Sequence, residues 1–538
     1  MTTYNRFIYL SMMLAACICG QPVFSQNVSV HSPVIPVVTD REYNILSEIR
    51  IVCTEEASVL SEVTLSIEGL PFKAIKNVRL MSTGTMSAIR SRSKSYVMQS
   101  EGKRLGGGQD IWCNPAFAKE IVCRKRTKSG MIRLPADYRL NKGENYLYVS
   151  MKVAGRRIHD LAVPFSLRVE SVVVNGVSAD LERFGSETKR LGVSVRQSGD
   201  DDVYSYRIPG LVTTSRGTLV AVYDIRYDSS LDLQNNIDIG VSRSTDGGKT
   251  WGPMIKAMDM GEWGGLPQAQ NGVGDPSVLV DETNGRIFIS ALWTHGLGVD
   301  RAWTSAGQGM DPAQTGQILL VSSDDDGRKW SSPVNITSQV KQPEWFLTLQ
   351  GPGRGICLKD GTLVFPIQHI APDRIPEAGI MYSLDGGNTW ATHSSARTNT
   401  TEAQVAELPD GRLMLNMRDN RKTGRAVSTT SDLGRTWEEH PSSGTLVEPV
   451  CMASLINAGN VLLFSNPAVK KGRSHTTIRS SIDGGCSWNS GLLLDEEENW
   501  GYSCMTMIDD ETVGILYESS VSQLLFQAVK LKDILSAE

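Results

Sequence analysis

The sequence predicts an all-β protein, in which a six-bladed β-propeller over residues 190–538 follows a β-sandwich-like domain over residues 27–185. Three observations support this fold. The chain has 538 residues, which is too long for one ordinary domain. Its 50 Gly and 22 Pro lie in regular turn-rich stretches, which favour many short strands over long helices. One eight-residue pattern occurs five times in the C-terminal part, as is typical of a propeller.

The first 25 residues have the pattern of a secretory signal peptide. Arg6 precedes an apolar run over residues 7–19, and small or polar residues surround Ser25. The run is too short and too isolated to be a membrane span. Residues 14–17, Leu-Ala-Ala-Cys, also resemble a lipobox, in which Cys17 would carry a lipid anchor. Cleavage near Ser25 is the preferred prediction, and in both cases we expect export to the periplasm or surface of a bacterium, or secretion.

The segment from about Val28 to Val174 predicts strands without an internal repeat. Val63, Leu65 and Ile67 alternate with polar residues, and residues 147–153 do the same. This alternation is typical of half-buried strands and therefore predicts a β-sandwich. No residue in the segment is a catalytic candidate, and a carbohydrate-binding or assembly role is assigned to it only from its position before the propeller.

The repeated pattern is Ser/Thr-x-Asp-x-Gly-x-x-Trp, and each copy follows an apolar stretch. The copies run over residues 244–251, 323–330, 383–390, 430–437 and 481–488. The pattern predicts a hairpin turn, in which Asp accepts backbone N–H bonds, Gly supplies a positive φ and Trp folds back over the turn. Intervals of roughly 50 to 80 residues between the Trp residues fit one four-stranded blade each. The sequence therefore predicts six blades, one of them without the motif, and a structural role for the repeated Asp residues.

Composition excludes several functions. A net charge of −5 without a basic block argues against nucleic-acid binding. The acidic run at residues 495–498 is expected to be a solvated loop. Only seven His occur and no C-x-x-C or H-E-x-x-H pattern is present, so no catalytic metal is expected.

Nine Cys do not form a disulfide scaffold in a chain of this length. Cys113 and Cys123 are candidates for a bridge across one loop. Five others are expected to be buried thiols: Cys53, Cys357, Cys451, Cys486 and Cys504.

The repeats, together with Tyr206-Arg207-Ile208-Pro209 ahead of the first copy, resemble the exo-sialidase (neuraminidase) family of bacterial and animal type, whose repeats are called Asp boxes. The resemblance extends from about Tyr204 to the end of the chain. It implies a glycoside hydrolase that removes terminal sialic acid from sialylated glycans such as host glycoproteins, mucins, gangliosides and sialyllactose. It implies no cofactor and no metal.

Three arginines match the arginines with which this family binds the sialic acid carboxylate. A carboxylate needs fixed cations, and Arg offers a planar fork with two donors. Arg207 matches the first, Arg418 in Leu415-Asn416-Met417-Arg418-Asp419 the second, and Arg473 the third. Arg479 is a rival for the third role, but it lies on the strand that enters the fifth Asp box.

Tyr502, in Gly501-Tyr502-Ser503-Cys504, matches the tyrosine nucleophile of the family. A neutral phenol avoids the repulsion that a carboxylate nucleophile would meet beside the carboxylate of the substrate. Because a phenol has a pKa near 10, it needs a base close by. Glu402, in Thr401-Glu402-Ala403-Gln404, matches that base, whereas Glu407 precedes a turn and is expected to be structural.

The general acid/base is predicted to be Asp232, in Ser230-Leu231-Asp232-Leu233, from its distance before the first Asp box. Its competitors are Asp224, Asp228 and Asp238. Asp238 alternates with apolar residues like a strand residue. Asp224 is expected to shape the site together with Arg226, which we assign as a further substrate-binding residue.

The resemblance implies a retaining reaction with a covalent intermediate on Tyr502. Trp263, Trp293, Trp303 and Trp345 line the pocket in one interpretation and pack between blades in the other. Three related alternatives share the same core residues: a trans-sialidase, an enzyme with an anhydro product, and a hydrolase for a deaminated sialic acid. A non-catalytic sialic-acid-binding propeller would keep the arginines without the full catalytic set.

Overall fold

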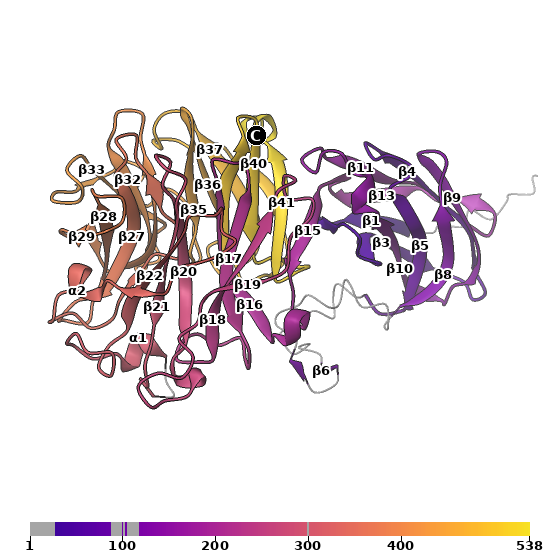
Figure 1. Cartoon of the computed structure of the whole chain (residues 1–538). Coiled ribbons are helices and arrows are strands. Elements are labelled where there is room, and N and C mark those ends of the chain that lie inside the picture. Colours follow the sequence, from indigo (N-terminus) through magenta and orange to yellow (C-terminus); the bar gives the residue numbers. More distant parts are fainter. Residues whose placement is uncertain (1–26, 88–98, 101–102, 105–117, 299–300, 538) are drawn as a thin grey trace, which may run out of the picture.

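A computed structural model describes residues 27–87, 99–100, 103–104, 118–298 and 301–537 of the chain. These residues form an all-β molecule in which a two-sheet sandwich lies beside a propeller (Figure 1). The sandwich, in indigo and purple, lies next to the propeller edge that contains the last strands of the chain, in yellow. The predicted signal peptide and Cys17 lie outside the described residues.

The sandwich is built from residues between Asn27 and Lys189. Its first sheet has the order β13 (Leu181–Gly185), β1 (Asn27–Ser32), β3 (Asn44–Cys53), β10 (Gly143–Val153), β5 (Ile75–Gly84) and β8 (Lys119–Arg126). The second has the order β12 (Val177–Ser178), β11 (Phe165–Val174), β4 (Val59–Glu68) and β9 (Met131–Arg139), and β14 (Thr188–Lys189) also pairs with β11. Strands β6 (Gln99–Ser100) and β7 (Lys103–Arg104) form a separate pair.

The predicted alternation is confirmed in β4, where Val63, Leu65 and Ile67 are all buried. Strand β10 differs from the prediction, because both of its faces are covered. Tyr148 is buried with Met81 in a second apolar cluster, and its hydroxyl donates a hydrogen bond of 2.7 Å to Glu48. Central strands of a sheet acquire such cover from partners distant in the sequence, which alternation alone does not reveal.

The propeller contains six sheets among the described residues, each starting with a strand near the centre. Blade 1 contains β16 (Ser205–Thr213), β17 (Leu219–Arg226), β18 (Ile237–Ser244) and β19 (Ile255–Met258). Blade 2 contains β20 (Val273–Val280), β21 (Ile287–Trp293), β22 (Gln317–Ser323), β23 (Val334–Asn335) and β25 (Gly353–Arg354). Blade 3 contains β24 (Thr348–Gln350), β26 (Ile356–Cys357), β27 (Leu363–Ile370), β28 (Pro376–Ser383), β29 (Ala391–Thr392) and β30 (Arg397–Thr398).

The remaining blades follow in chain order. Blade 4 contains β31 (Thr400–Glu407), β32 (Leu413–Asp419), β33 (Ala426–Thr430) and β34 (Glu438–Glu439). Blade 5 contains β35 (Ser454–Ala458), β36 (Val461–Pro467), β37 (Thr476–Ser481) and β38 (Leu492–Asp495). Blade 6 contains β39 (Ser503–Asp509), β40 (Thr512–Tyr517), β41 (Leu524–Lys530) and β15 (Leu191–Arg196).

The sixth blade closes the ring with strands from both ends of the propeller. Strand β15 precedes blade 1 in the sequence and pairs antiparallel with β41, so that Val193 faces Phe526. This explains why one blade lacks the motif, since no hairpin joins its third and fourth strands. Strand β2 (Val37–Val38) then pairs parallel with β15, so a segment of the N-terminal region extends a propeller blade.

The five Asp boxes form the predicted turns between the third and fourth strands of blades 1 to 5. In the first box, Asp246 Oδ1 accepts the Thr250 N–H at 3.0 Å and Ser244 Oγ accepts the Gly248 N–H at 2.9 Å. The φ of Gly248 is 85°. The Trp390 indole donates to the Gly387 carbonyl at 3.2 Å, so the ring folds over its own turn. These contacts confirm a structural role for the boxes.

Helices are few and short in the part of the chain that the structure describes. They are α1 (Ala302–Ser305), α2 (Thr337–Val340) and α3 (Leu531–Leu535), with 3-10 turns at Gly155–Arg157, Asp200–Asp202 and Gln268–Gln270. No described helix is long and apolar enough to cross a membrane.

The cysteine prediction is partly wrong. Cys53, Cys451 and Cys504 are buried, but Cys357 is half-buried. Cys486 is exposed because it occupies a variable turn position of the fifth Asp box. Cys113, the candidate partner of Cys123, lies outside the described residues.

Candidate active site

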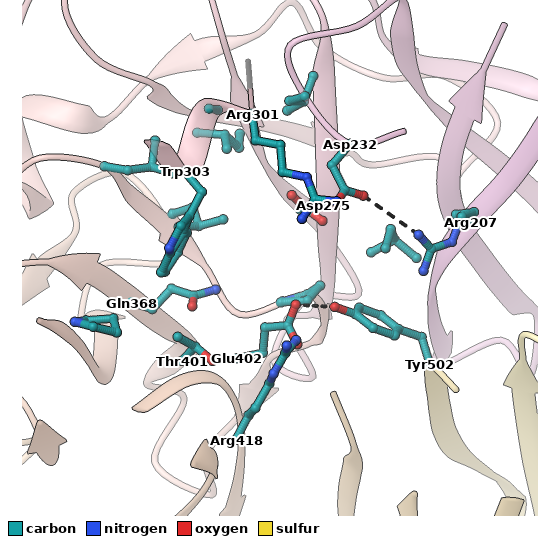
Figure 2. Close-up of a pocket in the computed structure, with 18 of the residues that line it drawn as sticks. Arg207, Asp232, Asp275, Arg301, Trp303, Gln368, Thr401, Glu402, Arg418 and Tyr502 are labelled. Atoms are coloured by element: carbon teal, nitrogen blue, oxygen red, sulfur yellow. Dashed lines mark hydrogen bonds and ion pairs between the residues drawn. The ribbon is translucent and has the colours of Figure 1, made fainter. Parts of the chain in front are cut away.

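Side chains from all six blades line one cavity of about 580 Å³ (Figure 2). Because every blade contributes to it, the cavity lies at the centre of the propeller. It brings together six residues that the sequence predicted as site residues: Arg207, Asp232, Glu402, Arg418, Arg473 and Tyr502. Their positions span nearly 300 residues of sequence, and only closure of the ring makes them neighbours.

Arg207 lies on β16, the first strand of blade 1, and a buried carboxylate holds its guanidinium. Glu518 accepts from Arg207 Nε at 3.0 Å and from the Ile208 N–H at 3.1 Å. The Trp500 ring centroid lies 4.5 Å from the guanidinium carbon. Burial alone lowers the pKa of Arg207, but the charges of Glu518 and Asp232 raise it above its ordinary value. Arg207 is therefore a fixed cation.

Arg418 and Arg473 come from blades 4 and 5. Arg418 follows the buried part of β32, and its Nη1 donates to Glu402 Oε2 at 2.8 Å. Its Nε is buried and has no hydrogen-bond partner among the described residues. Arg473 lies between β36 and β37, and its Nη1 donates to the Trp500 carbonyl at 2.8 Å. Both side chains line the cavity.

Tyr502 precedes β39 and lies between the arginines. Its hydroxyl donates a short hydrogen bond to Glu402 Oε1, on β31 of blade 4 (Figure 2). The guanidinium carbons of Arg207 and Arg473 are each 5.6 Å from the centroid of its ring. Burial, followed by the negative charge of Glu402, raises the pKa of Tyr502 well above its ordinary value. The phenol is therefore neutral near neutral pH.

Asp232 faces Tyr502 across the cavity, on the loop between β17 and β18 (Figure 2). Its Oδ1 lies 2.9 Å from Arg226 Nη1 and 3.7 Å from Arg207 Nη1. Burial by itself raises the pKa of Asp232, but the charges of Arg226 and Arg207 outweigh it and lower the pKa below its ordinary value. Its side chain is 47% exposed, so a ligand in the cavity can reach it.

This arrangement has the parts needed for chemistry on a small anion. Three guanidinium groups from three blades can bind a carboxylate through charge-assisted hydrogen bonds. A neutral phenol with a carboxylate base lies among them. A second carboxylate stands on the opposite side of the cavity.

The chain matches two protein families. Residues 217–517 match the BNR repeat-like domain, and residues 25–178 match the N-terminal domain of BNR-repeat neuraminidase. A sialidase of Bacteroides fragilis (strain YCH46) is 47% identical over 535 residues, which cover 96% of this chain and 97% of that protein. The chain belongs to the BNR-repeat sialidase family. It is accordingly a glycoside hydrolase.

Two further relatives are also sialidases. The solved structure of the Hadza microbial sialidase Hz136 is similar with a TM-score of 0.87 and 48% identity, and covers 94% of this chain and 100% of that chain. A sialidase of Micromonospora viridifaciens is 32% identical over 338 residues, which cover 60% of this chain and 51% of that protein.

Sequence reasoning missed several residues of the sialidase site. Glu518 follows β40 and, besides Arg207, accepts the Tyr502 N–H at 3.1 Å. Asp275, on β20, lines the cavity, and burial together with the charge of Asp224 raises its pKa well above the ordinary value. Arg301 also lines the cavity and points toward Asp232 (Figure 2). The only indication in the sequence was that Glu518 is an acidic residue directly after an apolar strand.

Arg226 differs from its predicted place. It is 1% exposed and does not line the sialidase cavity. Its guanidinium holds Asp224 Oδ2 at 2.8 Å and the Ser230 carbonyl at 2.7 Å, in addition to Asp232. The structure therefore shows Arg226 orienting the Asp232 loop, and direct substrate binding by it stays a prediction.

The rejected candidates lie away from the cavity. Asp228 accepts from Asn236, Asp238 is buried beneath Tyr227, and Glu407 accepts the Lys359 N–H at 3.2 Å. Arg479 lies on β37 and its Nη1 is 3.4 Å from Asn466 Oδ1.

The two interpretations do not cover all four tryptophans, because Trp263 is 43% exposed and does not line the cavity. Trp303 lines the sialidase cavity. Trp293 is buried, and Trp263 packs edge-on against it at 4.8 Å between ring centroids. Trp345 stacks on His369 at 3.6 Å.

The prediction of a solvated loop for the acidic run at residues 495–498 is wrong for Asp495, which ends β38, whereas Glu498 is exposed as predicted. Asp495 is fully buried and accepts from Ser520 Oγ at 2.7 Å and the Ser520 N–H at 2.8 Å. Burial raises its pKa to about 7.

Within the described ranges, no group of three or more His, Cys, Asp or Glu side chains is arranged to hold a metal ion.

Proposed function

We propose that this sialidase is an exo-α-sialidase that hydrolyses terminal sialic acids of glycoproteins, glycolipids and oligosaccharides with retention of configuration. The observation that carries the proposal is the hydrogen bond between Tyr502 and Glu402 inside a ring of three arginines. Glycosidases ordinarily use two carboxylates, and sialidases are an exception with a tyrosine nucleophile. The raised pKa of Tyr502 supports the need for Glu402 as its base.

In the first step, Arg207, Arg418 and Arg473 hold the carboxylate of the sugar. Asp232 gives its proton to the glycosidic oxygen while the bond from that oxygen to the anomeric carbon breaks. Tyr502 Oη forms a bond to the same carbon, and Glu402 takes the phenolic proton. In the second step, water attacks the anomeric carbon and passes a proton to Asp232. The Tyr502 oxygen leaves and recovers its proton from Glu402.

The charges around Asp232 support substrate-dependent protonation. The charges of Arg226 and Arg207 outweigh the effect of burial and lower the pKa of Asp232, which disfavours the acid form. A carboxylate bound by Arg207 offsets part of that positive charge. The pKa of Asp232 then rises, and the residue becomes a better acid when the substrate is in place.

We further propose the cellular localisation and the substrates of the enzyme. The pattern of residues 1–25 supports export to the periplasm, the cell surface or the medium, with a lipid at Cys17 as the alternative to cleavage near Ser25. Sialylated mucins, glycoproteins, gangliosides and sialyllactose are the proposed substrates. Transfer to a sugar acceptor and formation of an anhydro product are the alternative reactions.

The test is release of sialic acid from 3′- and 6′-sialyllactose by the wild type and by two pairs of variants. Tyr502→Phe removes the nucleophile, and Asp232→Ala should lower kcat/KM by about 10²- to 10⁴-fold. Glu402→Gln should lower it as well, whereas Glu407→Gln, on the same strand, should leave it unchanged. NMR of the first product anomer separates retention from inversion. Saturable binding without release would move the assignment to a sialic-acid-binding propeller, and an anhydro or transferred product would move it to the related enzymes.

A further inference from the structure

The connection between β38 and β39, residues 496–502, touches two distant parts of the molecule. Its first residue contacts the sandwich domain. Its last residues, Trp500 and Tyr502, reach the active site. We call it the 496–502 connection.

On the sandwich side, the contact is made by Glu496. Its N–H donates to the Val34 carbonyl at 2.9 Å, just after β1. Its Oε1 lies 3.9 Å from Nε2 of His31, which is on β1 itself. The Glu496 side chain is only 24% exposed, so the domain contact partly removes it from solvent.

Lys189, on β14 of the sandwich, adds a second basic group near Glu496. It is 1% exposed, and its ammonium donates to the Pro33 carbonyl at 2.6 Å. Burial lowers the pKa of Lys189 to about 8, and the negative charge of Glu496 acts in the opposite direction. The charge of Glu496 therefore favours the ammonium form of Lys189 at this domain contact.

On the active-site side, the connection supports two of the three arginines. The Asn499 N–H donates to the Arg473 carbonyl at 2.8 Å, and the Trp500 carbonyl accepts from Arg473 Nη1 at 2.8 Å. The Trp500 ring lies against the Arg207 guanidinium. Displacement of Trp500 therefore changes the position of both cations.

Hydrogen bonds link the backbone next to Glu496 to the residue before Trp500. The Asn499 side-chain amide donates to the Glu497 carbonyl at 3.2 Å and to Thr476 Oγ1 at 3.1 Å. On the far side of Trp500, Gly501 has a φ of 89°, and a Cβ built on it would lie 2.9 Å from Cys451 Sγ and 3.1 Å from Cδ of Arg473. Such close packing leaves Trp500 little room to absorb a shift locally. A change at Glu496 therefore reaches Trp500 through Glu497 and Asn499.

We propose that the sandwich domain positions the substrate-carboxylate site of the propeller through Glu496. Glu496 is a positioning residue, since it acts through Trp500 on Arg207 and Arg473 and touches no substrate itself. The inference deepens the proposed function and rests on it. It gives the N-terminal domain a role in the reaction that is separate from any sugar binding of its own.

The first experiment compares Glu496→Gln with Glu498→Gln in the full chain. Glu498 is exposed and lies two residues away in the same connection, so it is a matched control. Glu496→Gln should raise KM for 3′-sialyllactose about three- to fivefold, as expected for loss of one partly exposed charge contact, with kcat unchanged. The inhibition constant of free sialic acid should rise by the same factor. Glu498→Gln should leave both unchanged.

The second experiment is a double-mutant cycle with Trp500→Ala. If Glu496 acts through Trp500, Glu496→Gln has no further effect on KM in the Trp500→Ala background. If Glu496 had only a structural role, Glu496→Gln would lower Tm, and the effects of Glu496→Gln and Trp500→Ala on KM would multiply in the double variant. That result would overturn the inference. Equal KM values for the Glu496 and Glu498 variants would overturn it as well. Both results require an active wild type, so they are distinguishable from failure of the proposed sialidase reaction, in which the wild type itself releases no sialic acid.

Discussion

Glu518→Gln removes the charge beneath the first arginine while keeping the size of the side chain. In the wild type, Glu518 is 1% exposed and accepts four hydrogen bonds, from Arg207 Nε at 3.0 Å, Arg207 Nη2 at 3.4 Å, the Ile208 N–H at 3.1 Å and the Tyr502 N–H at 3.1 Å. If the amide oxygen of the glutamine takes the place of Oε1, the NH₂ group takes the place of Oε2. It then faces two donors, Arg207 Nη2 and the Tyr502 N–H. Two hydrogen bonds are lost, and Arg207 keeps a buried charge without its counterion.

The expected cost follows from these contacts. Removing one partner of a buried ion pair costs about 3–5 kcal/mol of stability, so the free energy of unfolding should fall by ~3 kcal/mol. Displacement of Arg207 weakens one charge-assisted contact with the substrate carboxylate, which is worth about 1.5–3 kcal/mol, or roughly 10- to 100-fold in kcat/KM. Urea unfolding and sialic acid release measure the two effects.

Asp326→Asn is the matched control. Asp326 is also buried, and it accepts from Thr214, Thr218 and Arg243 at 2.6 to 2.7 Å, but it lies in the second Asp box and does not line the cavity. This variant should lose stability while kcat/KM stays at the wild-type value. If Glu518→Gln loses stability with a wild-type kcat/KM, the assignment of Glu518 to the site is refuted.

Two further variants test the electrostatics. Arg301→Ala removes one of the positive charges that lower the pKa of Asp232. The pH profile of kcat/KM has one limb that reports Asp232, and this limb should move to higher pH. An unchanged profile would contradict this placement of Arg301. Asp385→Ala tests the third Asp box, where hydrogen bonds from the Thr389 hydroxyl and N–H lower the pKa of Asp385 from 3.8 to about 2. Because the folded pKa is depressed, this stability is present above about pH 4 and lost as the pH falls toward 2. Thermal unfolding of the variant should therefore depend less on pH between 4 and 2 than that of the wild type, and parallel curves would contradict it.

The propeller could be predicted because its signal is local and repeated. Each Asp box makes its hydrogen bonds within eight residues, as the Ser244–Trp251 copy shows, so the sequence contains the whole turn. Arg207, Arg418 and Tyr502 were identified because they match motifs of the sialidase family, and these motifs lie at the ends of apolar strands. Such positions bring side chains to the rim of a blade, where the sequence order of the blades is also their spatial order.

What could not be predicted depends on contacts between distant residues. Glu518 is 311 residues from Arg207, and nothing around Glu518 indicates an arginine partner. The prediction for Asp495 was wrong for the same reason, because its partner Ser520 is 25 residues away in the sequence. Glu496 is half-buried because it contacts the first strand of the sandwich. A rule that assigns charge runs to solvent considers only neighbours in the sequence.

The charges that line the cavity explain why a small carboxylate suits it as a ligand. Arg207 and Arg418 pair with Glu518 and Glu402, whereas the Arg473 guanidinium donates to a backbone carbonyl. Arg301 adds a cation that lowers the pKa of Asp232. Burial has meanwhile raised the pKa of Tyr502 above its ordinary value, so the phenol contributes no compensating negative charge near neutral pH. A bound carboxylate reduces this excess of positive charge, and that reduction favours the proton on Asp232 when the glycosidic oxygen is within reach.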